Sequence, residues 1–133
     1  MKLNVDCVRD VLLSVEENQT LNNNYKPIPL TLEKLYRVAR LANYTKCDIS
    51  YAVEKLGEAG LLKTNIKWNL LTNHVIVIDD ISYEGHEFIE KIREPKIWKK
   101  TKDISSKAGA FSIKLLGTIA EKVALSFLES FIP

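Results

Sequence analysis

Apolar residues recur at intervals of three and four along the first part of the chain, a spacing that is typical of amphipathic helices. In the first such stretch, apolar side chains line one face from Val5 to Val15. Asn4 stands immediately before this stretch, where an asparagine side chain can cap a helix. We therefore predict a helix that begins after Asn4 and ends in the polar residues Glu17–Gln19.

Two more helices are predicted after a short edge strand near residues 25–30, where two prolines exclude a helix. Thr31 and Thr45 are in position to cap these helices, and Asn43-Tyr44 separates them. Two helices of about 12 residues joined by a short corner form the helix-turn-helix pattern. The inward positions are expected to be Leu35, Val38, Ala39 and Ala42 in the first helix and Ile49, Ala52, Val53 and Leu56 in the second.

The pattern then changes to the period of two that is typical of strands. Residues 61–70 alternate in this way, and residues 74–78 are rich in β-branched side chains. Leu71–Asn73 is the candidate turn between them. Together these features predict a β-hairpin, which after a helix-turn-helix would be a wing.

A fourth helix is predicted from Tyr83 to about Glu94, with Ser82 as its cap and Gly85 allowing it to approach the core closely. Pro95 ends or kinks this helix. The predicted fold class is therefore α+β, mostly helical: a winged helix-turn-helix domain over residues 1–94 with a C-terminal helical extension over residues 95–133. The inward positions of the fourth helix are expected to be Phe88, Ile89 and Ile92.

The stretch from Phe111 to Pro133 is the most apolar in the chain and has helical spacing. Such a helix does not stay exposed on a monomer. It covers its own domain, pairs with a second subunit or lies on a membrane, and its mixed polar face disfavours the membrane. We expect a homodimer, with these positions in the interface: Leu116, Ile119, Val123 and Phe127.

Charge is distributed unevenly along a chain whose composition, 46% hydrophobic and 27% charged, is ordinary for a globular protein. Residues 1–95 hold 12 Lys and Arg against 14 Asp and Glu, a net of −2, whereas residues 96–133 hold 7 against 3, a net of +4. The net positive charge therefore lies C-terminal to the predicted helix-turn-helix domain. No signal peptide and no transmembrane run is visible, and Cys7 and Cys47 are expected to be free thiols in a reducing cytoplasm.

The order of elements resembles the winged-helix superfamily, and two stretches strengthen the likeness. Residues 53–62 resemble the end of a recognition helix that runs through Ala-Gly-Leu into a wing, and residues 81–89 resemble the Leu-Thr-x-Glu-Gly junction after it. The chain also resembles, over nearly its whole length, a family of short uncharacterised proteins from Gram-positive bacteria and their phages. That likeness rests on Met1-Lys2-Leu3 with Asp6 and Arg9, on Glu84–Phe88, and on Trp98–Lys102.

The superfamily resemblance implies DNA binding, with the third helix in the major groove and the wing on the backbone. Asp48 and Glu54 on the third helix oppose this, and the alternative is an inherited helix-turn-helix that now packs against a protein. For the basic segment Lys96–Lys102 three roles stay open: its lysines contact phosphates, they approach an anionic membrane, or Trp98 packs on the core while the lysines lie in water. The candidate DNA-binding residues are Lys46, Ser50, Tyr51 and Lys55 in the third helix, Lys63 and Lys67 in the wing, and Lys99 and Lys100 behind Pro95.

Nothing in the sequence indicates an enzyme, a metal site or a cofactor. His74 and His86 lack ligands at the spacing of a zinc site, and no phosphate-binding loop, nucleophile elbow or dinucleotide motif appears. The first hypothesis is a homodimeric transcriptional regulator of phage or mobile-element origin that binds double-stranded DNA. The alternative is a protein-interaction module, such as a phage-encoded modulator of a host protein.

Overall fold

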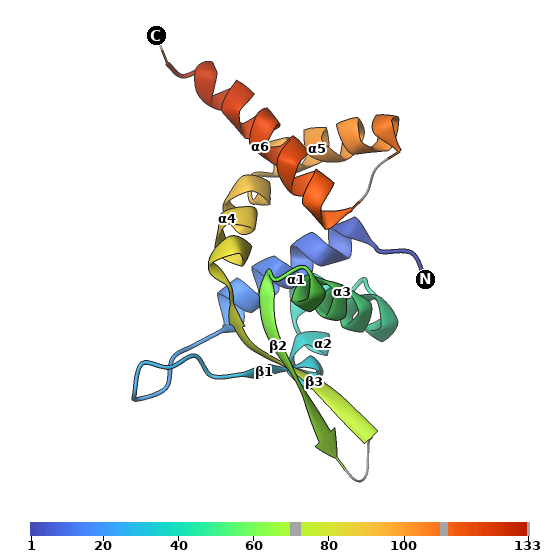
Figure 1. Ribbon diagram of the computed structural model, residues 1–133, viewed down its shortest axis with the longest axis vertical. Helices are drawn as coiled ribbons and strands as arrows, with labels where there is room; N and C mark the ends of the chain where they lie inside the picture. The colour runs from blue at the N-terminus through green and yellow to red at the C-terminus, as the bar shows by residue number, and fades with distance from the viewer. Residues whose placement is uncertain (70–72, 110–111, 133) are drawn as a thin grey trace. The chain divides into compact units, whose positions relative to one another are not determined.

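The computed structural model describes residues 1–69, 73–109 and 112–132, and it confirms the α+β, mostly helical class. The chain divides into two compact units, Met1–His86 and Glu87–Pro133. The elements are α1 (Val5–Asn18), β1 (Leu30–Thr31), α2 (Leu32–Tyr36), the 3-10 helix η1 (Ala39–Leu41), α3 (Lys46–Glu58), β2 (Leu62–Asn69), β3 (Asn73–Ile81), α4 (Tyr83–Ile92), α5 (Pro95–Ala108) and α6 (Ile113–Glu129), and all except η1 are labelled in Figure 1.

Three helices begin where the sequence predicts, because each has a side chain that satisfies a free backbone N–H of the first turn. The Asn4 side chain accepts a hydrogen bond from the backbone N–H of Cys7 at 3.1 Å, which caps α1. Thr45 accepts one from Asp48 at 3.0 Å at the start of α3. The Ser82 hydroxyl accepts one from the Gly85 backbone at 3.0 Å at the start of α4.

The prediction of a second helix of about 12 residues is wrong. Thr31 does cap α2, but that helix has five residues. Val38 is extended, with φ −72° and ψ 130°, and a short 3-10 turn follows it. This break resets the helical phase, so Ala39 and Ala42 are exposed, whereas Leu41 is 1% exposed and joins the core.

The sheet is small and antiparallel, with the strand order β1-β3-β2. The edge strand predicted near residues 25–30 forms only at its last position, where Leu30 pairs with Ile78. In the hairpin a register irregularity falls between Lys63 and Thr64. The hairpin itself is confirmed, but most of its predicted turn lies at residues 70–72, outside the described residues.

The core of the first unit joins α1 and α3 to the sheet. All four predicted inward positions of α3 are buried, and Leu12 and Ile78 are fully enclosed with them. Burial of a leucine or isoleucine side chain stabilises a fold by roughly 1.5–3 kcal/mol. Gly85 of α4 is also confirmed as a close approach, because a Cβ there would collide with the carbonyl oxygen of Leu61.

The second unit contains the end of α4 with α5 and α6. The fourth helix ends at Ile92, before Pro95, and Pro95 is the first residue of α5, a position where its missing N–H costs nothing. Gly109, with φ 69°, ends α5, and the Ser112 side chain caps α6. Phe88 of α4 packs against Gly117 of α6 within the second unit, whose first residue, Glu87, lies inside α4. No helix of the described residues is long and apolar enough to cross a membrane.

Candidate functional site

The outward side of α3 brings together the four residues predicted for that helix. The buried stripe of Ile49, Ala52, Val53 and Leu56 occupies the opposite side. Lys46 is exposed, and Ser50, Tyr51 and Lys55 are partly exposed. A shallow hollow of about 360 Å³ lies on this surface, lined by Met1, Tyr36, Lys46, Cys47, Ser50, Tyr51 and Glu54.

Two lysines of this surface are positioned by aromatic rings. The Nζ atom of Lys46 lies 5.3 Å from the centroid of the Tyr36 ring, and that of Lys55 lies 5.3 Å from the centroid of the Tyr51 ring. Such cation–π contacts contribute roughly 0.5–1 kcal/mol at exposed sites. They restrict where each ammonium group sits, so the charges are partly pre-positioned.

Tyr36 is the residue of this site that the sequence analysis missed. It is the last residue of α2, and only the early break after that helix places its ring beside α3. Burial raises the pKa of Tyr36 above its usual value, and the carboxylate of Glu33 raises it further. The phenol is therefore neutral at physiological pH and offers a ring face and a hydroxyl beside Lys46.

Acidic side chains of α3 offset the positive charges of Lys46 and Lys55. Lys55 donates a hydrogen bond from Nζ to the Glu58 carboxylate at 2.9 Å, and this contact raises the Lys55 pKa. Asp48 is half-buried in the first turn, and Glu54 is exposed between the two lysines. An exposed ion pair of this kind is weak and is screened by salt, so the Lys55–Glu58 pair can be exchanged for another anion.

The β2–β3 hairpin carries the two predicted wing lysines, and both are exposed. Lys63 pairs across the strands with Asp80, whereas Lys67 pairs with Val75. Lys67 is therefore the one of the two whose cross-strand neighbour is apolar.

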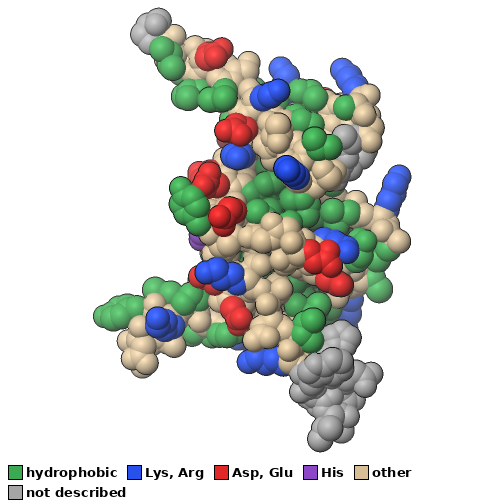
Figure 2. All heavy atoms as spheres, in the orientation of Figure 1, with side chains coloured by type: hydrophobic (Ala, Val, Ile, Leu, Met, Phe, Trp, Pro, Cys, Tyr) green, Lys and Arg blue, Asp and Glu red, His purple; other side chains and the backbone are tan. Residues whose placement is uncertain are grey.

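In the second unit, α5 has an apolar side and a basic side. Trp98 is buried, in agreement with its expected packing role, and Lys102 lies over its ring at 5.9 Å from the centroid. Lys99 and Lys100 are both exposed. Figure 2 shows Lys and Arg side chains gathered around this second unit. A shallow hollow of about 330 Å³ on α5 is lined by Lys96, Lys99, Lys100, Asp103, Ile104 and Lys107.

The four residues of α6 that the sequence predicts for the subunit interface differ in their exposure to solvent. Leu116 and Val123 are buried within the single chain, so neither is open to a partner. Ile119 and Phe127 are partly exposed. Beyond them the apolar surface continues in Leu128, 54% exposed, and, after the end of the helix, in Phe131, 79% exposed.

No cluster of metal-ligating side chains is found within the parts of the chain that the structure describes. Both cysteines are free: Cys7 is buried in α1 and Cys47 is exposed on α3. Burial raises the pKa of the Cys7 thiol to about 12, with smaller contributions from Asp48 and Asp10. Cys7 is therefore a packing residue without nucleophilic character.

A family model described as "Hypothetical protein (DUF2513)" matches residues 2–111. The chain belongs to this family. The DUF2513 match spans the first unit, α4 and α5, and it stops before α6. A protein from Haemophilus influenzae (strain Rd), described as uncharacterized, is 25% identical over 129 residues, which cover 96% of this chain and 99% of that protein. This alignment extends into α6. No solved structure matches the chain.

Proposed function

We propose that the first unit is a winged helix-turn-helix domain that binds double-stranded DNA. In this proposal α2 and α3 form the helix-turn-helix, and β2 and β3 form the wing. The observation that carries it is the outward side of α3, where Lys46 and Lys55 flank Ser50 and Tyr51 opposite a fully buried stripe. A helix of 13 residues with one free polar side has the dimensions of a major-groove reader.

Each residue type has a distinct part in this mechanism. Lys46 and Lys55 contact phosphates, which position the helix but read no sequence. Ser50 and Tyr51 lie between them and reach base edges with hydroxyl groups. Because α3 has no arginine, the paired contact that arginine makes to guanine is absent from it, and discrimination between bases is modest.

Lysines outside α3 extend the contact with the DNA backbone. Lys63 and Lys67 of the hairpin lie on the wing, and Lys99 and Lys100 of α5 belong to the part of the chain with the net charge of +4. Phosphate neutralisation supplies most of the affinity in complexes of this kind. We propose that the protein is a transcriptional regulator and that two copies act on a two-fold symmetric site.

Binding of pooled genomic DNA fragments to the full chain, measured over a range of salt concentrations, tests this proposal. Affinity is expected to fall steeply as salt increases, because each phosphate contact contributes about −0.9 to the slope of log affinity against log salt. Lys46→Ala with Lys55→Ala is expected to weaken binding and to reduce that slope by about two.

The matched control is Lys26→Ala with Lys122→Ala, which removes the same charge from a loop and from α6. The control is expected to retain the affinity of the natural sequence. If the α3 pair and the control pair weaken binding equally, the interaction is non-specific attraction and α3 is not the reading helix. If DNA is not retained even at low salt, the proposal is wrong.

A protein-interaction module is the second candidate, and the acids of α3 favour it. Glu54 is exposed between the lysines, and Glu58 pairs with Lys55. Glu54→Lys separates the two candidates, because it removes a repulsion from phosphates. On a DNA-binding surface it increases affinity for DNA, with the exposed Glu129→Lys in α6 as the matched control. If neither variant changes DNA retention, the surface of α3 serves another partner.

A further inference from the structure

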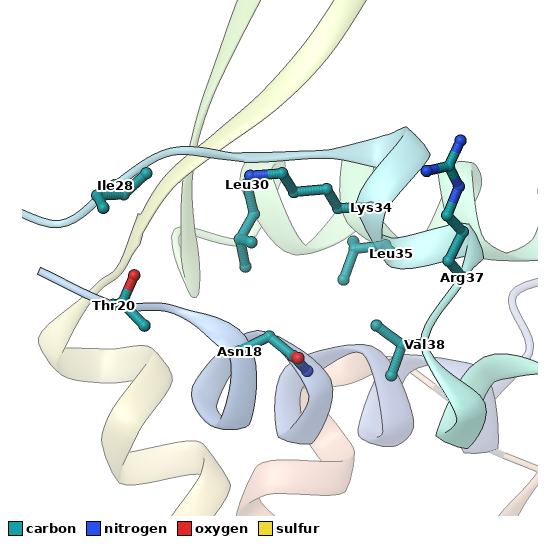
Figure 3. Close-up of a pocket in the computed structure, with 8 residues that line it drawn as sticks. All are labelled: Asn18, Thr20, Ile28, Leu30, Lys34, Leu35, Arg37 and Val38. Atoms are coloured by element: carbon teal, nitrogen blue, oxygen red, sulfur yellow. The ribbon is translucent and has the colours of Figure 1, made fainter.

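A second cavity lies in the first unit, away from the outward side of α3. It has a volume of about 320 Å³ and lies between the end of α1, the segment that leads into β1, and α2 (Figure 3). The local fold explains why space remains there. β1 has only two residues and α2 ends after five, so neither element is long enough to close over the end of α1.

The inner wall of this cavity is apolar. Leu30 and Leu35 are buried at its base, and Val38, partly exposed, and Ile28, exposed, lie at its sides. In Figure 3 Leu30 and Val38 both point into the space between the β1–α2 segment and α1. Apolar side chains that face a water-filled hollow gain stability when an apolar group displaces that water. The wall therefore favours a ligand with a hydrocarbon body.

The rim of the cavity is cationic. Lys34 and Arg37 are exposed on α2, and neither forms an ion pair with any residue that the structure describes. Figure 3 shows the Lys34 side chain extending in the direction of Leu30, over the apolar wall. The acid Glu17 near the end of α1 is already paired with Arg40 at 2.5 Å. The two rim cations thus retain the capacity to pair with an anion from solution.

The opposite rim supplies uncharged polar groups from the last residue of α1 and from the chain that follows it. Asn18 donates a hydrogen bond from Nδ2 to the Ser14 carbonyl at 2.7 Å, which fixes the orientation of its side-chain amide. Thr20 lies beside it with a hydroxyl that can donate to an anion. An apolar base between a cationic rim and a hydroxyl has the character of a small-molecule site.

We propose that this cavity binds a small amphipathic carboxylate. Its alkyl or aryl body lies against Leu30, Leu35 and Val38, and its carboxylate pairs with Lys34 at the rim, where the nearby Arg37 adds positive charge. The volume is near the lower end of the range of known ligand pockets, so the ligand is small. Charge complementarity excludes an amine with the same body. This inference goes beyond DNA binding and holds whether or not the protein binds DNA.

Titration of the isotope-labelled full chain with octanoate, followed by amide NMR, tests the proposal. Saturable shifts are expected at residues 18–20, 28, 30 and 34–38 at concentrations up to about 10 mM. Octylamine, which has the same chain length and the opposite charge, is expected to produce no saturable shift there. No saturable octanoate shift, shifts confined to other residues, or equal binding of octylamine would each overturn the proposal.

Charge-reversal variants test the role of the rim. Lys34→Glu with Arg37→Glu changes only exposed side chains and is expected to raise the octanoate Kd at least about tenfold. The matched control is Lys26→Glu with Lys63→Glu, which makes the same charge change at exposed positions outside the cavity. If both pairs change the Kd equally, net charge and not the rim explains the binding, and the site as proposed is wrong.

Discussion

The two cysteines of this chain lie in opposite environments. Cys7 is fully buried in α1, and its thiol pKa is raised to about 12. Cys47 is exposed on the outward side of α3. Because the thiolate is the nucleophilic form, burial suppresses the reactivity of Cys7 both by blocking access and by keeping the proton on the sulfur.

Alkylation with iodoacetamide at about pH 8 is therefore expected to modify Cys47 alone in the folded protein. Mass spectrometry of the intact chain is expected to show one added group, and a second only after unfolding in denaturant. Cys47→Ser is the control and is expected to remain unmodified while folded. Rapid modification of Cys7 in the folded chain would contradict the buried position of α1.

At the scale of elements, helices with regular apolar spacing could be predicted from the sequence, whereas the broken helical stretch after Thr31 could not. α1 and α3 follow from their apolar spacing and from caps at Asn4 and Thr45, which are local signals. The break at Val38 has no such signal, because the sequence from Thr31 to Ala42 contains neither glycine nor proline. Packing against the rest of the unit decides it, with Leu41 taking the core position.

The residues of the candidate site divide in the same way, into those that helical spacing predicts and those that it does not. The lysines of α3 were found from helical spacing, which places Lys46, Ser50 and Glu54 on one side. Tyr36 and the cavity between α1 and α2 were not found, because both depend on where α2 ends and on how neighbouring segments pack against each other. Single-residue propensities carry little information on such contacts.

The hairpin yields a prediction that distinguishes it from α3. Lys63→Ala with Lys67→Ala is expected to weaken binding to all DNA sequences by the same factor and to reduce the salt slope by about two, because wing lysines contact phosphates. Ser50→Ala with Tyr51→Phe is expected to change the preference among sequences instead. Competition between DNA pools of different sequence measures both effects. A change of sequence preference in the wing variant would assign base reading to the hairpin.

At the scale of the whole molecule, the DUF2513 match ends at a different place from the boundary between the acidic and the basic parts of the chain. The match ends at residue 111 and includes the lysines of α5, whereas α6 lies beyond it. The apolar stripe of α6 is half covered: Leu116 and Val123 are buried, but toward the C-terminal end Phe127 is partly exposed and Leu128 and Phe131 are mostly exposed. The covered half stabilises the chain, and we propose that the open half is the surface for a second copy.

This division predicts separate effects of substitutions along α6. Light scattering of the full chain is expected to give twice the monomer mass of 15.2 kDa. Leu128→Lys with Phe131→Lys is expected to halve that mass with little change in Tm, because both side chains are exposed.

Leu116→Ala is expected to lower the free energy of unfolding by about 2–5 kcal/mol while the folded protein stays dimeric, because it leaves a cavity inside the single chain. A monomer mass for the natural sequence, or dissociation caused only by Leu116→Ala, would show that the exposed end of α6 is not the subunit interface.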